Sequence, residues 1–156
     1  MKKKILLGLS GSVACSKAEL FVIKNSEKLE FKLLSTHSGL NYLSEEFIKS
    51  NNIYSDWSEL SGSPHIELAR WADEIIIYPA SANLISKISS GIADDLLTST
   101  ILMFSKPIYI CPAMHEEMYM NTQIQSNILN LSINHYIVGP RYGNLDIGDK
   151  GLGRLI

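Results

Sequence analysis

Apolar stretches of four or five residues alternate along the chain with longer stretches in which apolar residues recur every three or four positions. The short stretches predict buried strands, and the longer ones predict amphipathic helices. The expected strands span residues 5–9, 31–35, 75–79, 108–111 and 135–138. The expected helices span residues 13–29, 40–49, 65–71 and 116–131, with two more after residue 83 that join at 91–93. Strands that alternate with helices are typical of an α/β domain with a parallel sheet.

One stretch after the third predicted strand carries the strongest signal for a binding site. The uninterrupted apolar run at 75–79 is typical of a strand buried on both faces. The small residues Ala80, Ser81 and Ala82 follow it, at the position where open α/β sheets bind ligands. Their size lets a flat ligand approach the backbone, and Ser81 and Asn83 supply hydrogen-bond donors and acceptors. This lining predicts a planar heteroaromatic ligand.

Two hydroxyl-rich loops follow the first two predicted strands. Ser10, Gly11 and Ser12 come after the first strand, and Ser35 and Thr36 end the second. A small-residue loop at a helix N-terminus presents free N–H groups and the positive end of the helix dipole, which favour a phosphate. The first loop alone is explained equally well by a tight reversal of the chain. Because both loops are expected at the same edge of the sheet, the pair favours a phosphate site.

Two polar features have both a structural and a functional interpretation. Asp94 and Asp95 precede an apolar run and are either helix caps or catalytic carboxylates, and capping is the commoner use of adjacent acids. Tyr54 and Trp57 lie in an irregular polar stretch at 50–64. They either anchor that loop, which is the commoner role, or face a ligand or a neighbouring subunit.

The chain after residue 139 is rich in glycine and poor in apolar residues. It contains Gly143, Gly148, Gly151 and Gly153. This composition is typical of a mobile loop. We therefore expect residues 1–156 to form one domain in which 139–156 is a mobile flap without a core element.

Composition excludes several classes of protein. The chain has 156 residues, 46% of them hydrophobic and 19% charged, which suits one core and is too apolar for disorder. The net charge of −2 gives no electrostatic case for a nucleic-acid partner. No apolar run approaches the roughly 20 residues that cross a bilayer, and 4–9 is too short for a secretory signal, so we expect a cytoplasmic protein without a membrane partner. Cys15 and Cys111 lack metal-ligand spacing, so we expect two free core thiols and no metal.

Five motifs occur in one order along the chain. They are HIELARWAD at 65–73, PASAN at 79–83, GIADDLLT at 91–98, PAM at 112–114 with Met118 and Tyr119, and GLGR at 151–154. In this order and spacing they resemble the flavin-dependent cysteine decarboxylases. The resemblance is greatest to the phosphopantothenoylcysteine decarboxylases of coenzyme A synthesis, which are often the N-terminal half of a longer protein that also carries the synthetase. It covers nearly the whole chain, and five motifs in one order are specific although any single one is weak.

The resemblance implies a three-layer doubly wound sheet, Rossmann-like or flavodoxin-like, that binds FMN. It places the FMN phosphate near Ser10, Gly11, Ser12, Ser35 and Thr36. It places the flavin ring near Ala80, Ser81, Asn83, Thr98 and Met114. Sites in the family lie between subunits of trimers that assemble into dodecamers. The resemblance therefore implies a homotrimer or homododecamer, in which Tyr54, Trp57 and the helix at 65–71 would face a partner subunit.

The chemistry of the family requires an electron sink before CO₂ leaves the carboxylate of a cysteine. Transfer of electrons from the thiol to FMN gives a thioaldehyde, and decarboxylation then gives an enethiolate. A histidine that matches His65 is essential in the family, and it suits a base or hydrogen-bond partner because imidazole titrates near neutrality. Without the motif around it, His65 would be a solvated residue at the start of a helix. With the motif, we expect it to be catalytic.

Two positions depart from the family pattern. His115 stands where the family has an asparagine that holds the substrate carboxylate. A protonated imidazole also binds a carboxylate, whereas a neutral one offers a single N–H donor at a different reach. Ile147 stands where the coenzyme A enzymes have a flap cysteine that helps reduce the enethiol to a saturated thiol. The residues expected to contact substrate are His115, Met118, Ile147 and Arg154.

Three functions remain open. The motifs at 65–73 and 151–154 favour decarboxylation of 4'-phosphopantothenoylcysteine to 4'-phosphopantetheine. Ile147 favours oxidative decarboxylation of a peptide's C-terminal cysteine, because the family members with that activity lack the flap cysteine and release the enethiol. A non-catalytic FMN-binding subunit agrees with His115 and Ile147 but not with His65. We expect the first function, with a small thiol carboxylate as the substrate.

Overall fold

A six-stranded parallel sheet forms the centre of the computed structural model, which describes residues 1–57 and 61–156. The strands are β1 (Lys3–Leu9), β2 (Leu29–Ser35), β3 (Ile53–Tyr54), β4 (Glu74–Ala80), β5 (Tyr109–Pro112) and β6 (Tyr136–Ile137). Their order across the sheet is β3-β2-β1-β4-β5-β6, and every neighbouring pair runs parallel. With the two-residue β3 this is the Rossmann order, and without it the order is that of flavodoxin. The predicted doubly wound parallel sheet is confirmed.

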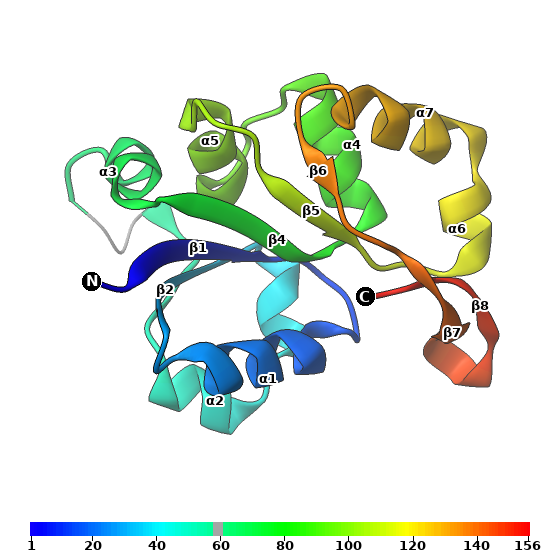
Figure 1. The fold of residues 1–156 in the computed structure, drawn as a ribbon, viewed down its shortest axis with the longest axis horizontal. Helices are drawn as coiled ribbons and strands as arrows, with labels where there is room; N and C mark the ends of the chain where they lie inside the picture. Colours follow the sequence, from blue (N-terminus) through cyan, green and yellow to red (C-terminus); the bar gives the residue numbers. More distant parts are fainter. Residues whose placement is uncertain (58–60) are drawn as a thin grey trace.

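Helices cover both faces of the sheet, so the domain has three layers (Figure 1). One face carries α1 (Cys15–Asn25) and α2 (Glu45–Ser50). The other carries α3 (Pro64–Trp71), α4 (Ala82–Ser90), α5 (Leu96–Met103) and α7 (Thr122–Leu131). The chain crosses from one helical layer to the other between β1 and β4, which are neighbours in the sheet. Ligands of such sheets bind in the crevice that opens at this crossing.

The side chains of β1 divide the core between the two helical layers. Leu6 is fully buried in a cluster with residues of α3, α4, α5 and α7, whereas Leu7 and Leu9 are buried with residues of α1 and α2. In β4, Ile75 and Ile77 are fully buried on the first side, and Ile76 and Tyr78 are partly buried on the other. The expectation that this strand has two covered faces therefore holds.

Two of the predicted helices are each broken by a capping residue. The predicted helix at 40–49 is a short 3₁₀ helix, Ser38–Tyr42, followed by α2, because the Ser44 side chain accepts a 3.2 Å hydrogen bond from Phe47 N and starts a new helix. The predicted helix at 116–131 is α6 (Glu116–Met120) and α7, separated by Asn121. Asn121 Oδ1 accepts from the backbone N–H of two residues at the start of α7. The predicted helix at 13–29 is also too long, because α1 begins at Cys15 and ends at Asn25.

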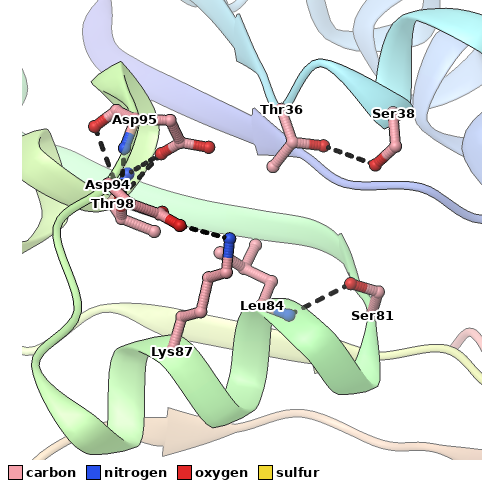
Figure 2. Close-up of polar contacts among 8 residues, drawn as sticks. All are labelled: Thr36, Ser38, Ser81, Leu84, Lys87, Asp94, Asp95 and Thr98. Atoms are coloured by element: carbon pink, nitrogen blue, oxygen red, sulfur yellow. Dashed lines mark hydrogen bonds and ion pairs between the residues drawn. The ribbon is translucent and has the colours of Figure 1, made fainter.

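The predicted break after residue 90 is confirmed, and its acidic residues have the expected structural role. Gly91 ends α4 in the left-handed conformation, with φ of 69°. Asp95 begins α5 with a capping box, in which its Oδ1 accepts a 2.7 Å hydrogen bond from Thr98 N and Thr98 Oγ1 accepts from Asp95 N (Figure 2). Asp94 forms a 2.8 Å ion pair with Lys87 of α4. The structure therefore favours structural roles over catalysis for both acids, capping for Asp95 and an ion pair for Asp94.

The C-terminal segment is a β-hairpin whose base joins the core, so the expectation that it holds no core element is wrong. Its strands are β7 (Arg141–Asn144) and β8 (Lys150–Arg154), which pair antiparallel. Leu155 is 1% exposed and packs with Cys111 and Ala113. The two glycines of β8 serve close packing, because both are buried, Gly151 against the side chain of Glu116 and Gly153 against the backbone of Met114.

Both cysteines are buried free thiols, as predicted. Burial raises the pKa of Cys15 to about 11 and that of Cys111 to about 12. Neither sulfur is a thiolate at neutral pH, so neither supplies a nucleophile. In the described part of the chain, no helix combines the length and the apolar character that crossing a membrane requires.

Candidate functional site

A cleft of about 530 Å³ lies where the loops after β1, β4 and β5 meet the hairpin. Its lining includes eight residues that were predicted for the site: Gly11, Ser12, Ser81, Met114, His115, Met118, Ile147 and Arg154. They come from four separate parts of the chain, and the crossing between β1 and β4 brings them together. A cleft of this volume suits a ligand the size of a cofactor or drug.

Ser10 ties together the two loops at the crossing point. Its Oγ donates a 2.7 Å hydrogen bond to Pro79 O and accepts a 2.8 Å hydrogen bond from Ser81 N. The side chain is 1% exposed, so it faces the protein and not the cleft. Ser10 therefore sets the relative position of the loops after β1 and β4, on which a ligand in the cleft would rest.

The two hydroxyl-rich loops lie against each other, as the sequence predicted. A Cβ added to Gly11 would lie 2.7 Å from Ser38 Oγ, so the loop after β1 touches the loop after β2. Thr36 Oγ1 accepts a 3.1 Å hydrogen bond from Gly39 N and lies 3.2 Å from Ser38 Oγ (Figure 2). Ser35 is 1% exposed, and its Oγ donates to Thr36 O. The two loops therefore form a compact set of small residues and hydroxyl groups of the type that suits a phosphate.

The loop after β4 contains one residue that was predicted to contact the flavin ring and that lines the cleft. Ser81 lines the cleft and caps α4, because its Oγ accepts a 3.2 Å hydrogen bond from Leu84 N (Figure 2). Ala80 and Thr98 are buried, the second within its capping box. Asn83 is exposed on α4 and does not line the cleft. Of the predicted ring contacts, Ser81 and Met114 thus face the cleft in this chain.

His115 lies between two carboxylates at the start of α6. Its Nε2 is 2.8 Å from Asp149 Oδ2, and its Nδ1 contacts Glu117 Oε2. A neutral imidazole has one N–H, so both contacts are hydrogen bonds only when the ring is protonated. The hydrogen bond to Asp149, together with the negative charge of Glu117, raises the pKa of His115. This environment favours the imidazolium, the form that binds a carboxylate.

Ile147 is at the tip of the hairpin and at the edge of the cleft. Its side chain is 84% exposed, and its φ of 54° lies in the left-handed region, which β-branched residues rarely adopt. The carboxylate of Asp146 accepts a 2.9 Å hydrogen bond from Ile147 N. Met118 is half-exposed on α6 and lines the same cleft. Two apolar side chains, Ile147 and Met118, thus lie at this edge of the cleft.

The base of the hairpin is fixed to the loop after β5. Met114 N donates a 3.0 Å hydrogen bond to Gly153 O, and a Cβ added to Gly153 would overlap Met114 O. Leu152 N donates a 3.0 Å hydrogen bond to Glu116 Oε1 of α6. This docking holds Arg154 at the cleft.

Two residues of the site were not predicted from the sequence. Lys17 of α1 lines the cleft, and its Nζ donates a 2.8 Å hydrogen bond to Leu155 O. Its only signal in the sequence is its place one turn beyond the loop at 10–12. Asp149 holds His115 across 34 residues, and no local pattern indicates that contact.

His65 does not line this cleft. It is in the first turn of α3, where its ring centroid lies 4.9 Å from that of Trp57. Its Nδ1 is buried and has no hydrogen-bond partner among the described residues. Within one chain, the structure therefore does not bring His65 together with His115. The predicted partner-facing role of Tyr54 and Trp57 stays a prediction.

Comparison with known proteins gives a family match over almost the whole chain. Residues 1–155 match the family model described as Flavoprotein. The chain is 36% identical over 163 residues to the coenzyme A biosynthesis bifunctional protein CoaBC of Vibrio cholerae serotype O1, a match that covers 99% of this chain and 41% of that protein. It is 37% identical over 171 residues to a putative phosphopantothenoylcysteine decarboxylase of Dictyostelium discoideum, covering 99% and 87% of the two chains.

The fold also matches a solved structure over the whole length of this chain. A PPC decarboxylase mutant in complex with pantothenoylaminoethenethiol superimposes with a TM-score of 0.92 at 33% identity, covering 100% of this chain and 92% of that one. The chain spans less than half the length of the bifunctional relatives that it matches.

Proposed function

Because the chain belongs to the Flavoprotein family, we propose that it is an FMN-dependent decarboxylase that converts 4'-phosphopantothenoylcysteine to 4'-phosphopantetheine. The observation that carries this proposal is the cleft at the crossing of β1 and β4. Three of the five motifs that resemble the phosphopantothenoylcysteine decarboxylases supply residues to this cleft. They are 79–83, 112–114 with Met118, and 151–154. Relatives and a solved structure with the same activity in their names support it.

The residues around the cleft fit FMN. Gly11, Ser12 and Thr36 offer the close backbone and hydroxyls that suit its phosphate, and Ser81 and Met114 line the space for its ring. The remaining predicted contacts, Ser10, Ser35, Ala80, Asn83 and Thr98, lie behind or beside these residues. When bound, FMN would accept the electrons of thiol oxidation and so create the electron sink that decarboxylation requires.

His115 and Arg154 are positioned to hold the substrate. The imidazolium of His115 would bind the cysteine carboxylate with an N–H that now faces Asp149 or Glu117. Met118 and Ile147 would cover the apolar part of the substrate and exclude water from the reacting carbon.

His65 would take the thiol proton in the cleft of a neighbouring subunit. Its buried Nδ1 lacks a partner among the described residues, and it lies away from the cleft of its own chain. A homotrimer, alone or as the unit of a dodecamer, would complete the site in this way. The test is subunit complementation between His65→Asn and His115→Ala variants. Mixed and reassembled oligomers should regain activity if the two histidines of one site come from different chains, and should stay inactive if they come from the same chain.

Ile147 supports a second candidate function, the oxidative decarboxylation of a peptide's C-terminal cysteine. Isoleucine supplies no proton for return of the enethiol to a saturated thiol, and the flap position is at the edge of the cleft. Mass spectrometry of the products separates the two functions. Loss of CO₂ alone from 4'-phosphopantothenoylcysteine supports the first proposal, and loss of CO₂ and two hydrogens from a cysteine-ended peptide supports the second. FMN binding without turnover of either substrate would leave a non-catalytic flavoprotein.

A further inference from the structure

Three cationic side chains gather where the hairpin base meets α1. Lys17 and Arg154 line the cleft, and Lys17 Nζ donates its hydrogen bond to the carbonyl of Leu155, the residue after Arg154. Arg141 is the cross-strand partner of Arg154 in the β7–β8 pair. The docking of Gly153 against Met114 fixes the strand that carries Arg154. Two of the three positive charges therefore line one end of the cleft, and the third, Arg141, lies beside them on the neighbouring strand.

No carboxylate neutralises this cluster within residues 1–57 and 61–156. The ion pairs found there involve Lys3, Lys87 and His115. Two like charges directly opposite each other in an antiparallel pair destabilise the pair, and Arg141 and Arg154 have this relation. Burial, followed by the charges of Arg154 and Arg141, lowers the pKa of Lys17. The cluster thus carries uncompensated positive charge.

The carboxylate that lines the same cleft does not satisfy these cations. Asp146 directs its Oδ1 to the backbone N–H of Ile147 at the tip of the hairpin. Asp149 and Glu117 are engaged by His115. An anionic ligand group is therefore the missing counter-charge.

We propose that Lys17, Arg141 and Arg154 bind the phosphate group of the substrate, a proposal that rests on the proposed function. A phosphomonoester carries up to two negative charges and three acceptor oxygens, which match two guanidinium groups and one ammonium group. The hydroxyl loops at Ser12 and Thr36 provide a separate place for the phosphate of the flavin. The cleft then holds two phosphates, one on the cofactor and one on the substrate.

The experiment measures the binding of 4'-phosphopantetheine and of pantetheine to the FMN-loaded protein by calorimetry. The two ligands differ only in the phosphate. The unmodified protein should prefer the phosphorylated ligand, and Arg154→Gln should weaken its binding by about tenfold to a hundredfold, the usual effect of losing a charged hydrogen bond. Binding of pantetheine should not change. Lys150→Gln, on the same hairpin but outside the cluster, is the matched control and should leave both affinities unchanged.

Arg141→Gln keeps the test valid if the half-buried Arg154 or Lys17 is needed for folding. Arg141 is exposed, so its replacement does not disturb the core. The same selective loss of the phosphorylated ligand should follow. Equal binding of the two ligands by the unmodified protein, or an unchanged preference in both arginine variants, would overturn the proposal.

A comparison of FMN with riboflavin distinguishes the two possible sources of phosphate. If the cluster held the flavin phosphate, the arginine variants would lose the preference for FMN over riboflavin, and this result would also overturn the proposal. Failure of the proposed function gives a different pattern. In that case the protein releases no CO₂ from 4'-phosphopantothenoylcysteine, but its preference for the phosphorylated ligand and the loss of that preference in Arg154→Gln remain.

Discussion

His115 and Asp149 form a 2.8 Å hydrogen bond that joins the start of α6 to the turn of the β7–β8 hairpin. With Glu117 on the other ring nitrogen, the contact places a proton-dependent link at the edge of the cleft. The same imidazole is the group expected to bind the substrate carboxylate. If His115 binds the substrate carboxylate as proposed, the position of the hairpin and the binding of substrate are linked through one titrating residue.

Replacing Asp149 with asparagine should lower the pKa of His115, because the hydrogen bond to Asp149 is the largest cause of its increase. A pKa that is raised in the folded state stabilises the protein fully below the unfolded value of about 6.5, and this stabilisation is lost as pH rises through the folded value. The protection factors of the β7 and β8 amides, which remove the intrinsic acceleration of exchange with pH, should therefore fall as pH rises through the pKa of His115, and in the variant this fall should move to lower pH. NMR titration of the ring gives the pKa directly.

Asp146→Asn is the control for this variant. An asparagine oxygen still accepts from Ile147 N, and His115 does not contact this residue. Its ring should titrate as in the unmodified protein. An unchanged titration in Asp149→Asn as well would show that the link does not form in solution.

Replacing Ser10 with alanine should destabilise the fold by about 1–3 kcal/mol, because Ser81 N–H loses its acceptor and Pro79 O loses the hydrogen bond from Ser10 Oγ. Urea unfolding of the flavin-free protein measures the loss. Flavin affinity should also fall, since Ser10 positions both loops under the cleft. Ser12→Ala removes a hydroxyl from the same loop that accepts a local hydrogen bond from Ala14 N, and it should change the free energy of unfolding less. Equal decreases in the free energy of unfolding from the two substitutions would contradict the bridging role of Ser10.

Replacing His65 with asparagine should slow substrate oxidation by about 10²–10⁴-fold, the usual contribution of a general base. FMN should remain bound, because we assign His65 to the chemistry and not to the residues that hold the cofactor. Anaerobic bleaching of the flavin by substrate measures the first effect, and equilibrium titration measures the second. Glu67→Gln, on the same helix, is the control and should bleach at the normal rate. Normal bleaching in His65→Asn would remove this histidine from the chemistry.

Replacing Ile147 with cysteine should shift the product from enethiol towards the saturated thiol. The return step needs a proton, which a thiol can donate and the isoleucine side chain cannot. Ile147→Ser, which matches cysteine in size but carries no thiol, should leave the product as it was. Anaerobic incubation followed by mass spectrometry measures the ratio. If the unmodified protein already releases only saturated thiol over many turnovers, another group donates the proton and Ile147 is not at the reducing position.

Local patterns were sufficient to predict five of the six strands of the sheet and the loops of the cleft, whereas the two-residue β3 fell in a stretch expected to be irregular. The apolar runs at 5–9 and 75–79 lie within β1 and β4, and the small residues after them line or support the cleft. Breaks in helices were harder to find, since Ser44 and Asn121 lie inside runs whose apolar spacing continues across them. Ser44 is followed by two glutamates, a local sign of a helix start that would have located this break.

Contacts between distant residues account for what the sequence did not show. Lys17 meets Leu155 across 138 residues, and His115 meets Asp149 across 34. Neither contact follows from the spacing of apolar and polar residues, because it depends on where the hairpin docks. That docking in turn requires a residue without a side chain at position 153, because a Cβ there would overlap Met114 O. In the sequence pattern, this glycine indicates only a flexible segment.

The left-handed backbone of Ile147 has a consequence for the evolution of the sequence. A β-branched residue in the left-handed region costs about 1–3 kcal/mol, and glycine or asparagine at this position would relieve it. Its side chain is almost fully exposed, so burial within this chain does not repay the cost. Simple selection for stability would replace it. Ile147 therefore provides an apolar surface at the edge of the cleft at a cost in stability, and variants selected only for heat resistance should lose it early.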